Sequence, residues 1–211
     1  MKRVINLDNW NRKEHFKFFS ALDDPFWGIT TTVDFTSIYQ QSKNMEVSFF
    51  LYSVHFLLKC INATTAFKLR IENGEVVEYD KINISPTIGR EDGTFGFGFF
   101  EYDTDLSLFI ENAEKEIHRV KNSTGLSFSK DTARADVIRY SALPWFAFSE
   151  MKHAGSIQTG DSIPKISTGK LIQEKKKLLL PISISVHHGL VDGRNVAEFI
   201  QNVKDGQNPT L

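Results

Sequence analysis

The chain has 211 residues with 25 basic and 26 acidic side chains, so the balance of charge gives no reason to expect nucleic acid as a partner. No stretch approaches the roughly eighteen consecutive apolar residues of a membrane span, and the charged N-terminus does not read as a secretory signal peptide. The lone cysteine, Cys60, cannot form an internal disulfide, which favours a reducing, cytoplasmic location. A chain of this length can bury a core without disulfides, and residues 1–211 are predicted to form a single domain.

The first half of the sequence is predicted to hold two helices, one strand and two strand pairs. Asn73-Gly74 supplies the two positive-φ residues that a tight turn requires, so the residues around it are expected to form antiparallel strands. A capping aspartate and a continuous apolar run indicate the two helices. In chain order the predicted elements are a helix over 8–19 that begins at Asp8, a half-buried strand over 28–36, a buried helix over 48–61, a hairpin over 67–79, and a strand pair that flanks Asp92-Gly93.

The second half contains the most regular helical pattern in the chain. Apolar residues recur at three- and four-residue steps over 105–120, which gives one apolar face. After it the sequence predicts a strand over 135–150 broken by Pro144, strands over 163–171 and 177–186, and a helix over 195–203. Hairpins require antiparallel pairs, while strands and helices alternate only loosely. We therefore expect an α/β fold, a two-layer sandwich in which helices cover a mixed β-sheet.

The stretch PISISVHHGLVDGRN, Pro181 to Asn195, reads as a strand that ends in two histidines. Successive side chains of a strand point to opposite faces, so His188 continues the apolar side of Val186 while His187 points the other way. Such neighbours cannot converge on one metal ion, and no metal site is predicted. An imidazole at the end of an apolar face suits general base catalysis, because its ordinary pKa is near 6.5. The alternative for His188 is a core histidine satisfied by a backbone carbonyl.

The role of Asp192 is open at this point. It lies in a turn bracketed by Gly189 and Gly193, and it either orients the histidine, as in a serine-hydrolase triad, or caps the next helix and pairs with an arginine. The Gly-x-Ser-x-Gly signature of a serine nucleophile is missing from the sequence, so a covalent acyl-serine intermediate is not expected.

The segment VHHGLVDGRNVAEFI resembles the active-site signature of the type A chloramphenicol acetyltransferases, in which His-His-x-x-x-Asp-Gly precedes a short helix. NWNRKEHFKFF, residues 9–19, is similar to the opening helix of that family, and YSALPWFAF, residues 140–148, is similar to its Ser-Ala-Leu-Pro-Trp strand. IPKISTGK and LLLPISISVHH follow in family order. The chain is therefore identified as a member of this family, within the CoA-dependent acyltransferase superfamily. Dihydrolipoyl acyltransferase cores are disfavoured because the chain has no lipoyl domain or linker.

The resemblance implies transfer of an acetyl group from acetyl-CoA to a hydroxyl of chloramphenicol, by direct attack in a ternary complex. It implies that His188 is the general base that removes the hydroxyl proton. It also implies that Asp192 pairs with Arg12 of the opening helix, which favours the structural role of this aspartate over the triad role. Ser141 is implied to donate a hydrogen bond to the oxyanion of the tetrahedral intermediate.

Acetyl-CoA is the implied co-substrate. Ser167 falls where the family has a threonine that holds a water near the oxyanion. Lys170 either approaches a CoA phosphate or is a solvated surface lysine. The family is a homotrimer with active sites at subunit interfaces, where the histidine comes from one chain and most of the acceptor pocket from its neighbour. His187 is then expected to be structural and close to that interface.

The acceptor pocket is where the sequence departs from the family. Phe18, Phe19 and Trp27 remain aromatic and suit a nitrophenyl group, and Phe97 is expected to line the pocket in place of a smaller residue. Three hypotheses follow: chloramphenicol is the acceptor, the same chemistry serves another small hydroxylated or amine-bearing acceptor, or the chain is a non-catalytic trimeric ligand-binding protein. The positions that depart from the usual pocket are Asp23, Pro25, Phe97, Met151 and His153.

Overall fold

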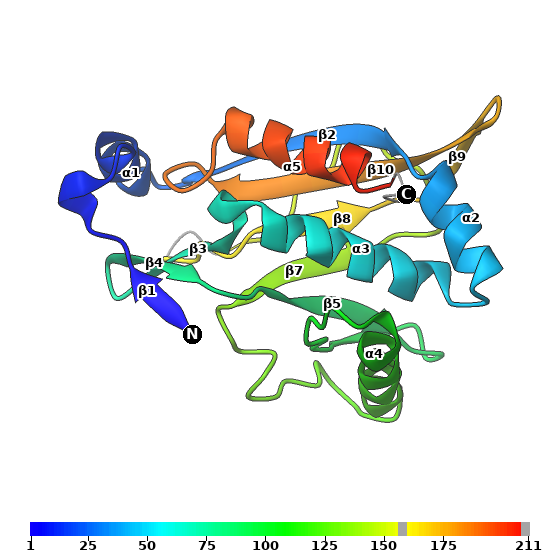
Figure 1. Ribbon diagram of the computed structural model, residues 1–211. Coiled ribbons are helices and arrows are strands. Elements are labelled where there is room, and N and C mark those ends of the chain that lie inside the picture. Colours follow the sequence, from blue (N-terminus) through cyan, green and yellow to red (C-terminus); the bar gives the residue numbers. More distant parts are fainter. Residues whose placement is uncertain (156–159, 208–211) are drawn as a thin grey trace.

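A mixed β-sheet with helices forms the body of the protein in the computed structural model, which describes residues 1–155 and 160–207 (Figure 1). The helices are α1 (Lys13–Ser20), α2 (Thr36–Asn44), α3 (Phe49–Ala63), α4 (Leu106–Lys121) and α5 (Gly193–Asp205), with short 3₁₀ helices at Leu7–Asn9 and Thr65–Lys68. The strands are β1 (Lys2–Val4), β2 (Phe26–Asp34), β3 (Leu69–Glu72), β4 (Glu75–Tyr79), β5 (Asn83–Gly89), β6 (Phe95–Phe97), β7 (Val137–Ala142), β8 (Lys165–Thr168), β9 (Ile172–Glu174) and β10 (Lys177–His187).

The main sheet has the strand order β2-β10-β8-β7-β5-β6, with β9 paired to β10. The central strand β7 runs parallel to both β5 and β8, whereas β10 runs antiparallel to β8 and β2. The sheet is therefore mixed, as the hairpins in the sequence require. A smaller antiparallel sheet, β1-β4-β3, lies beside it.

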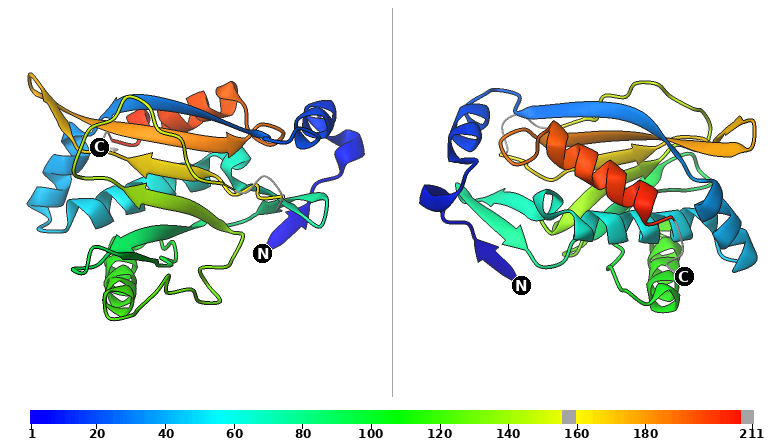
Figure 2. Two further views of the ribbon diagram at one scale, coloured as in Figure 1. Left: turned by 180° about the vertical axis from the view of Figure 1, so that it is seen from behind. Right: turned by 45° about the horizontal axis from the view of Figure 1, so that its top comes forward.

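The two faces of the main sheet differ in chemistry. On β10, Ile182 and Ile184 are fully buried on one face, while Ser183 and His187 occupy the other. Helices α3 and α5 lie along the apolar face, and from behind, the chain that connects β7 to β8 crosses the opposite face (Figure 2). The polar side chains of β10 therefore point away from the helices, toward that connection.

Most elements predicted from turns and periodicity are confirmed. The hairpin turn at Asn73 and Gly74 has φ values of 51° and 82°, the left-handed region that the sequence predicted. Helix α4 begins after Asp105, whose side chain accepts from the amides of Ser107 and Leu108. Cys60 is buried in α3 and lies in the core. Among the described residues, no helix has the length and apolar character needed to cross a membrane.

Several predicted boundaries are wrong. The strand predicted over 135–150 is only Val137–Ala142 and does not resume after Pro144. Asp8 does not begin a helix over 8–19: it lies in a 3₁₀ turn capped by Asn6, and its carboxylate pairs with Lys13, where α1 starts. The strand over 28–36 ends earlier, because Asp34 accepts from the amide of Thr36 and starts the unpredicted helix α2. The last helix begins at Gly193 rather than Asn195, because Asp192 is its cap.

Candidate active site

His188 lies directly after the end of β10, among three of the aromatic residues proposed for the acceptor pocket. Its ring stacks on Phe19 with centroids 3.8 Å apart and planes 17° apart, and the Trp27 ring lies 5.4 Å away on centroids. Trp27 is fixed in turn because its Nε1 donates to the carbonyl of Val191 at 3.0 Å. Phe18 meets Phe19 edge-on and is largely exposed. The structure thus groups the predicted base with Phe18, Phe19 and Trp27 of the same chain.

The backbone of His188 is held from two directions. Its amide donates to the carbonyl of Pro25 at 2.8 Å, and its carbonyl accepts from Nη2 of Arg12 at 3.2 Å. The same guanidinium forms an ion pair with Asp192 through Nη1. The imidazole Nδ1 of His188 is buried and has no hydrogen-bond partner within residues 1–155 and 160–207. Arg12 therefore ties the start of the chain to the turn that carries the histidine.

Asp192 performs the structural role rather than the triad role. One carboxylate oxygen accepts from the amides of Arg194 and Asn195, and the other pairs with Arg12. The amide of Asp192 in turn donates to Oδ1 of Asn195. Burial raises the pKa of Asp192, but the hydrogen bonds from Arg12 and from these amides outweigh it and leave the pKa below its ordinary value. The carboxylate of Asp192 therefore stays ionised, and it bonds Arg12 and the first turn of α5.

His187, the first histidine of the pair, is a buried neutral residue. Only 3% of its surface is exposed, its Nδ1 accepts from the amide of Gly189 at 3.2 Å, and its ring meets Phe26 edge-on. Burial, together with the neighbouring His188, lowers the pKa of His187 to about 4 against the pull of Asp161. The imidazole therefore accepts a backbone hydrogen bond and carries no charge at neutral pH.

We expect His187 to make the fold sensitive to acid. Because its folded pKa lies below the unfolded value near 6.5, the unfolded chain binds the proton first, so stability is full above that value and falls as the pH drops toward 4. His187→Asn retains an acceptor for Gly189 but does not titrate. Urea unfolding at equal protein concentration should therefore show that the variant loses about 2 kcal/mol less than the wild type between pH 7.5 and pH 5. Equal losses of unfolding free energy in the wild type and His187→Asn would contradict a buried, neutral His187. The matched control is His118→Asn, on the exposed face of α4.

A second group of predicted residues lies on β7 and β8. Ser141 and Ser167 are register partners on these parallel strands, so their side chains are neighbours on one face of the sheet. Ser141 accepts a hydrogen bond from Oγ1 of Thr87 at 3.1 Å, and Oγ of Ser167 lies 3.0 Å from Nε2 of His153. Lys170 follows β8 and is exposed, with its amide bonded to the carbonyl of Phe146.

The two groups do not meet within one chain. Ser167 pairs with Ser183 on β10, and His188 lies five residues beyond Ser183. At the usual rise per residue, His188 is about 16 Å from Ser183 along β10. Ser141 lies two strands away from Ser183, which adds about 10 Å across the sheet. Phe97 on β6 is farther across the sheet and stacks on Phe128 at 5.4 Å. The base and the proposed oxyanion donor of one chain are thus too far apart to act on the same substrate.

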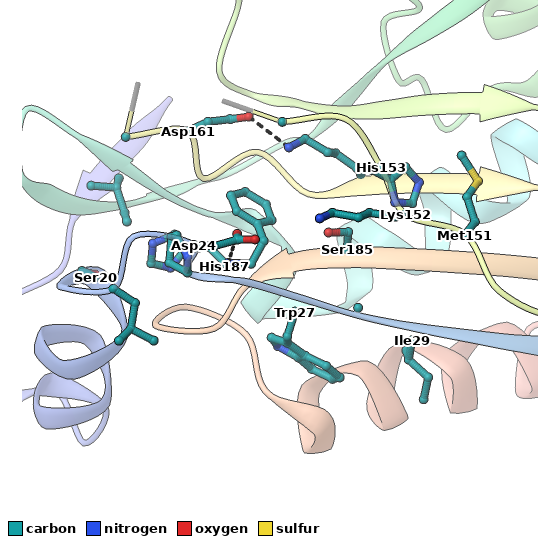
Figure 3. A pocket seen from close by; sticks show the side chains of 18 of the residues that line it. Ser20, Asp24, Trp27, Ile29, Met151, Lys152, His153, Asp161, Ser185 and His187 are labelled. Atoms are coloured by element: carbon teal, nitrogen blue, oxygen red, sulfur yellow. Dashed lines mark hydrogen bonds and ion pairs between the residues drawn. The ribbon is translucent and has the colours of Figure 1, made fainter. Parts of the chain in front are cut away.

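A cavity of about 790 Å³ opens on the polar face of the sheet, between β2, β10 and the segment that follows β7 (Figure 3). Pro25, Met151 and His153, three of the positions expected to depart from the family, line it together with Trp27. Asp23 is exposed in the single chain. Within the described part of the chain, no three His, Cys, Asp or Glu side chains gather in a way that could hold a metal ion.

A buried ion pair lies in the wall of this cavity. Nζ of Lys165 is 3.4 Å from the carboxylate of Asp161 and 4.2 Å from the ring centroid of Phe26. Burial and the charge of Lys165 both lower the pKa of His153. Sequence reasoning did not identify Lys165, Thr87 or the bond between His153 and Ser167. Alternating serines on the strands were the available signal, but only the cross-strand register reveals which side chains meet.

The chain matches proteins of one family over nearly its whole length. The family model described as chloramphenicol acetyltransferase matches residues 2–204. Chloramphenicol acetyltransferase 3 of Escherichia coli is 27% identical over 208 residues, which cover 98% of this chain and 97% of that protein. A solved chloramphenicol acetyltransferase has a TM-score of 0.90 at 29% identity, over 99% of this chain and 100% of that one. A probable dihydrolipoamide acetyltransferase of Listeria monocytogenes shares the fold, with a TM-score of 0.68 at 13% identity over 97% and 93%.

Proposed function

The chain belongs to the chloramphenicol acetyltransferase family of acetyl-CoA-dependent acyltransferases, and on that premise we propose that it acetylates a hydroxyl of chloramphenicol. The observation that carries this proposal is the His188 imidazole, which stacks on Phe19 and lies beside Trp27 while Arg12 and Pro25 hold its backbone. We further propose that residues 1–211 form one catalytic domain that acts in the cytoplasm.

In the proposed reaction His188 moves one proton. The hydroxyl oxygen of the acceptor attacks the thioester carbonyl while Nε2 of His188 takes the hydroxyl proton, because Nδ1 is buried. The tetrahedral intermediate then expels the CoA thiolate, which recovers that proton from the imidazolium. No residue is acylated, and both substrates are bound together. An alcohol is a poor nucleophile at neutral pH, and a positioned base contributes about 10² to 10⁴ in rate.

Ser141 and Ser167 are the proposed partners of the oxyanion. Their register places two hydroxyls side by side, and a hydroxyl donor at a developing negative charge contributes about 10² to 10³ in turnover. Ser167 is fully buried in the single chain, so it is proposed to act on the oxyanion through a bound water rather than directly. Lys170 is exposed beside β8 and is proposed to approach a phosphate of CoA.

We propose a homotrimer in which His188 of one subunit faces Ser141 of the next. Apolar side chains are exposed at both halves of this site: Phe18 is 63% exposed beside His188, while Phe128 and Trp145 are 70% and 74% exposed near the other half. A contact between two different surfaces forms a closed ring when the rotation between subunits closes, and the resemblance implies a ring of three. The subunit is proposed to be a two-layer sandwich whose polar sheet face turns toward its neighbours.

A different small acceptor is the second candidate, and the packing around Phe97 favours it. Phe97 stacks on Phe128 and meets Phe95 edge-on, so three bulky rings gather on that side of the proposed acceptor site. His153 and Met151 add a polar group and a flexible side chain to the lining of the cavity. These changes alter which alcohol or amine fits, and they leave His188 and the oxyanion donors in place.

Release of free thiol from acetyl-CoA tests the proposal. We expect release that depends on chloramphenicol and disappears in His188→Ala, from a particle of three 24.1 kDa chains in sedimentation. Acetyl-CoA binding without release on chloramphenicol, but with release on other small alcohols or amines, would select the second candidate. Binding without release on any acceptor would indicate a ligand-binding protein.

A further inference from the structure

Hydroxyl side chains from neighbouring strands form a row on the polar face of the main sheet. Ser141 on β7 is the register partner of Ser167 on β8, and Ser167 is the partner of Ser183 on β10. Thr87 on β5 joins the row through its bond to Ser141. Two of these hydroxyls are proposed to meet the oxyanion, so the groups on either side of them determine where their hydrogens point.

Thr87 leaves the hydrogen of Ser141 free. Oγ1 of Thr87 donates to Oγ of Ser141 at 3.1 Å, so the serine oxygen is an acceptor in this bond. A hydroxyl has one hydrogen to donate. The hydrogen of Ser141 can therefore point to a third group, such as a negatively charged oxygen in front of the sheet.

His153 stands in the same relation to Ser167. Ser167 is fully buried, and its oxygen lies 3.0 Å from Nε2 of the imidazole, whose Nδ1 is buried without a partner in the described part of the chain. Burial and Lys165 lower the pKa of the imidazole, which favours the neutral form with one hydrogen. With that hydrogen on Nε2, His153 donates to Ser167.

We propose that His153 and Thr87 are positioning residues for catalysis: each donates a hydrogen bond to one serine and turns that serine's own hydrogen toward the acetyl oxyanion, directly for Ser141 and through a bound water for Ser167. The proposal rests on the proposed function, because it assigns the oxyanion as the common acceptor. Chains of hydrogen bonds polarise one another, so each serine is also a stronger donor than it would be alone.

Variants at His153 separate positioning from packing. His153→Leu removes the donor, and we expect kcat to fall about 10-fold while both KM values change less than about twofold, since the bond matters only when charge develops. His153→Gln can place an amide nitrogen near Nε2, and it should recover most of kcat. His153→Asn is too short to do so and should not. In a Ser167→Ala background, His153→Leu should have no further effect on kcat.

Thr87→Val and Ser183→Ala complete the series. Thr87→Val keeps the shape but loses the hydroxyl, and we expect a fall in kcat of about 10-fold that Thr87→Ser restores. Ser183 lies next in the row, and its hydroxyl donates to the carbonyl of Met151, so Ser183→Ala is the matched control and should leave kcat unchanged. Full turnover in both His153→Leu and Thr87→Val would overturn the proposal.

The tautomer of His153 gives a readout that does not depend on turnover. Nitrogen-15 shifts of the imidazole in the whole protein should report hydrogen on Nε2 and none on Nδ1, and the opposite tautomer would overturn the proposal. Thiol release that needs His188 but is unaffected by the His153 and Thr87 variants would overturn the positioning role alone. Absence of any release that needs His188 would overturn the proposed function, and with it this inference.

Discussion

His188→Ala is expected to lower kcat at least about 10³-fold and to leave the fold and the binding of acetyl-CoA intact. The imidazole is the proposed acceptor of the hydroxyl proton, and its ring lies against Phe19 at 3.8 Å without a side-chain hydrogen bond to the rest of the described chain at Nδ1. Removal therefore eliminates the base while Arg12 and Pro25 still hold the backbone of the turn.

Steady-state thiol release, with circular dichroism and titration of acetyl-CoA on the same preparation, measures these effects separately. His118→Ala on the exposed face of α4 removes an imidazole without touching the site and should keep full activity. Turnover of His188→Ala within tenfold of the wild type would show that another group takes the proton. A variant that fails to fold would be replaced by His188→Gln, for which the same loss of kcat is expected.

Asp192→Ala is expected to lower both stability and turnover. The substitution removes the cap of α5 and the partner of Arg12 together, and a cap contributes about 0.5–2 kcal/mol while a charged hydrogen bond contributes about 1.5–3 kcal/mol. Since the pair is only partly buried, we expect a loss of about 2–4 kcal/mol in the free energy of unfolding. Turnover should also fall, because Arg12 is no longer held where it bonds the carbonyl of His188.

Asp192→Asn distinguishes the two roles of this residue. Asparagine caps helices about as well as aspartate, so this variant keeps the cap and loses only the charge that pairs with Arg12. We expect a smaller loss of stability than in Asp192→Ala but a comparable fall in kcat. Denaturant unfolding and thiol release on both variants provide the test. A fall in rate with unchanged stability in Asp192→Ala would contradict the structural role of the pair.

Turn residues and helix caps in the sequence predicted those elements that depend on neighbouring residues alone. Asn73-Gly74 can adopt positive φ without strain, so the hairpin was predictable, and so was the helix after Asp105. The boundaries failed where a side chain redirected the backbone. The side chain of Asn6 accepts from a backbone amide in the turn before α1, and that of Asp34 does so before α2. Such side-chain bonds to the backbone do not change the hydrophobic periodicity of the sequence, so the pattern could not predict them.

The candidate site could be predicted residue by residue but not as an arrangement. The His-His-x-x-x-Asp-Gly motif identified His188 and Asp192, and the resemblance identified Arg12, whose ion pair with Asp192 is present in the structure. The separation of Ser141 from His188 follows from the order and direction of β7, β8 and β10. Strand order depends on contacts between segments far apart in the sequence, so the hydroxyl row and the partners Thr87 and His153 became visible only in the fold.

Mixed oligomers test the shared active site most directly. His188→Ala and Ser141→Ala chains, each nearly inactive alone, are unfolded, combined in equal amounts and refolded together. If His188 of one subunit works with Ser141 of the next, random assembly into rings of three gives each interface both native residues about one time in four, so the mixture should recover about a quarter of wild-type turnover. Activity no higher than the average of the two parent variants would contradict the account, because a site built within one chain has no native copy in this mixture.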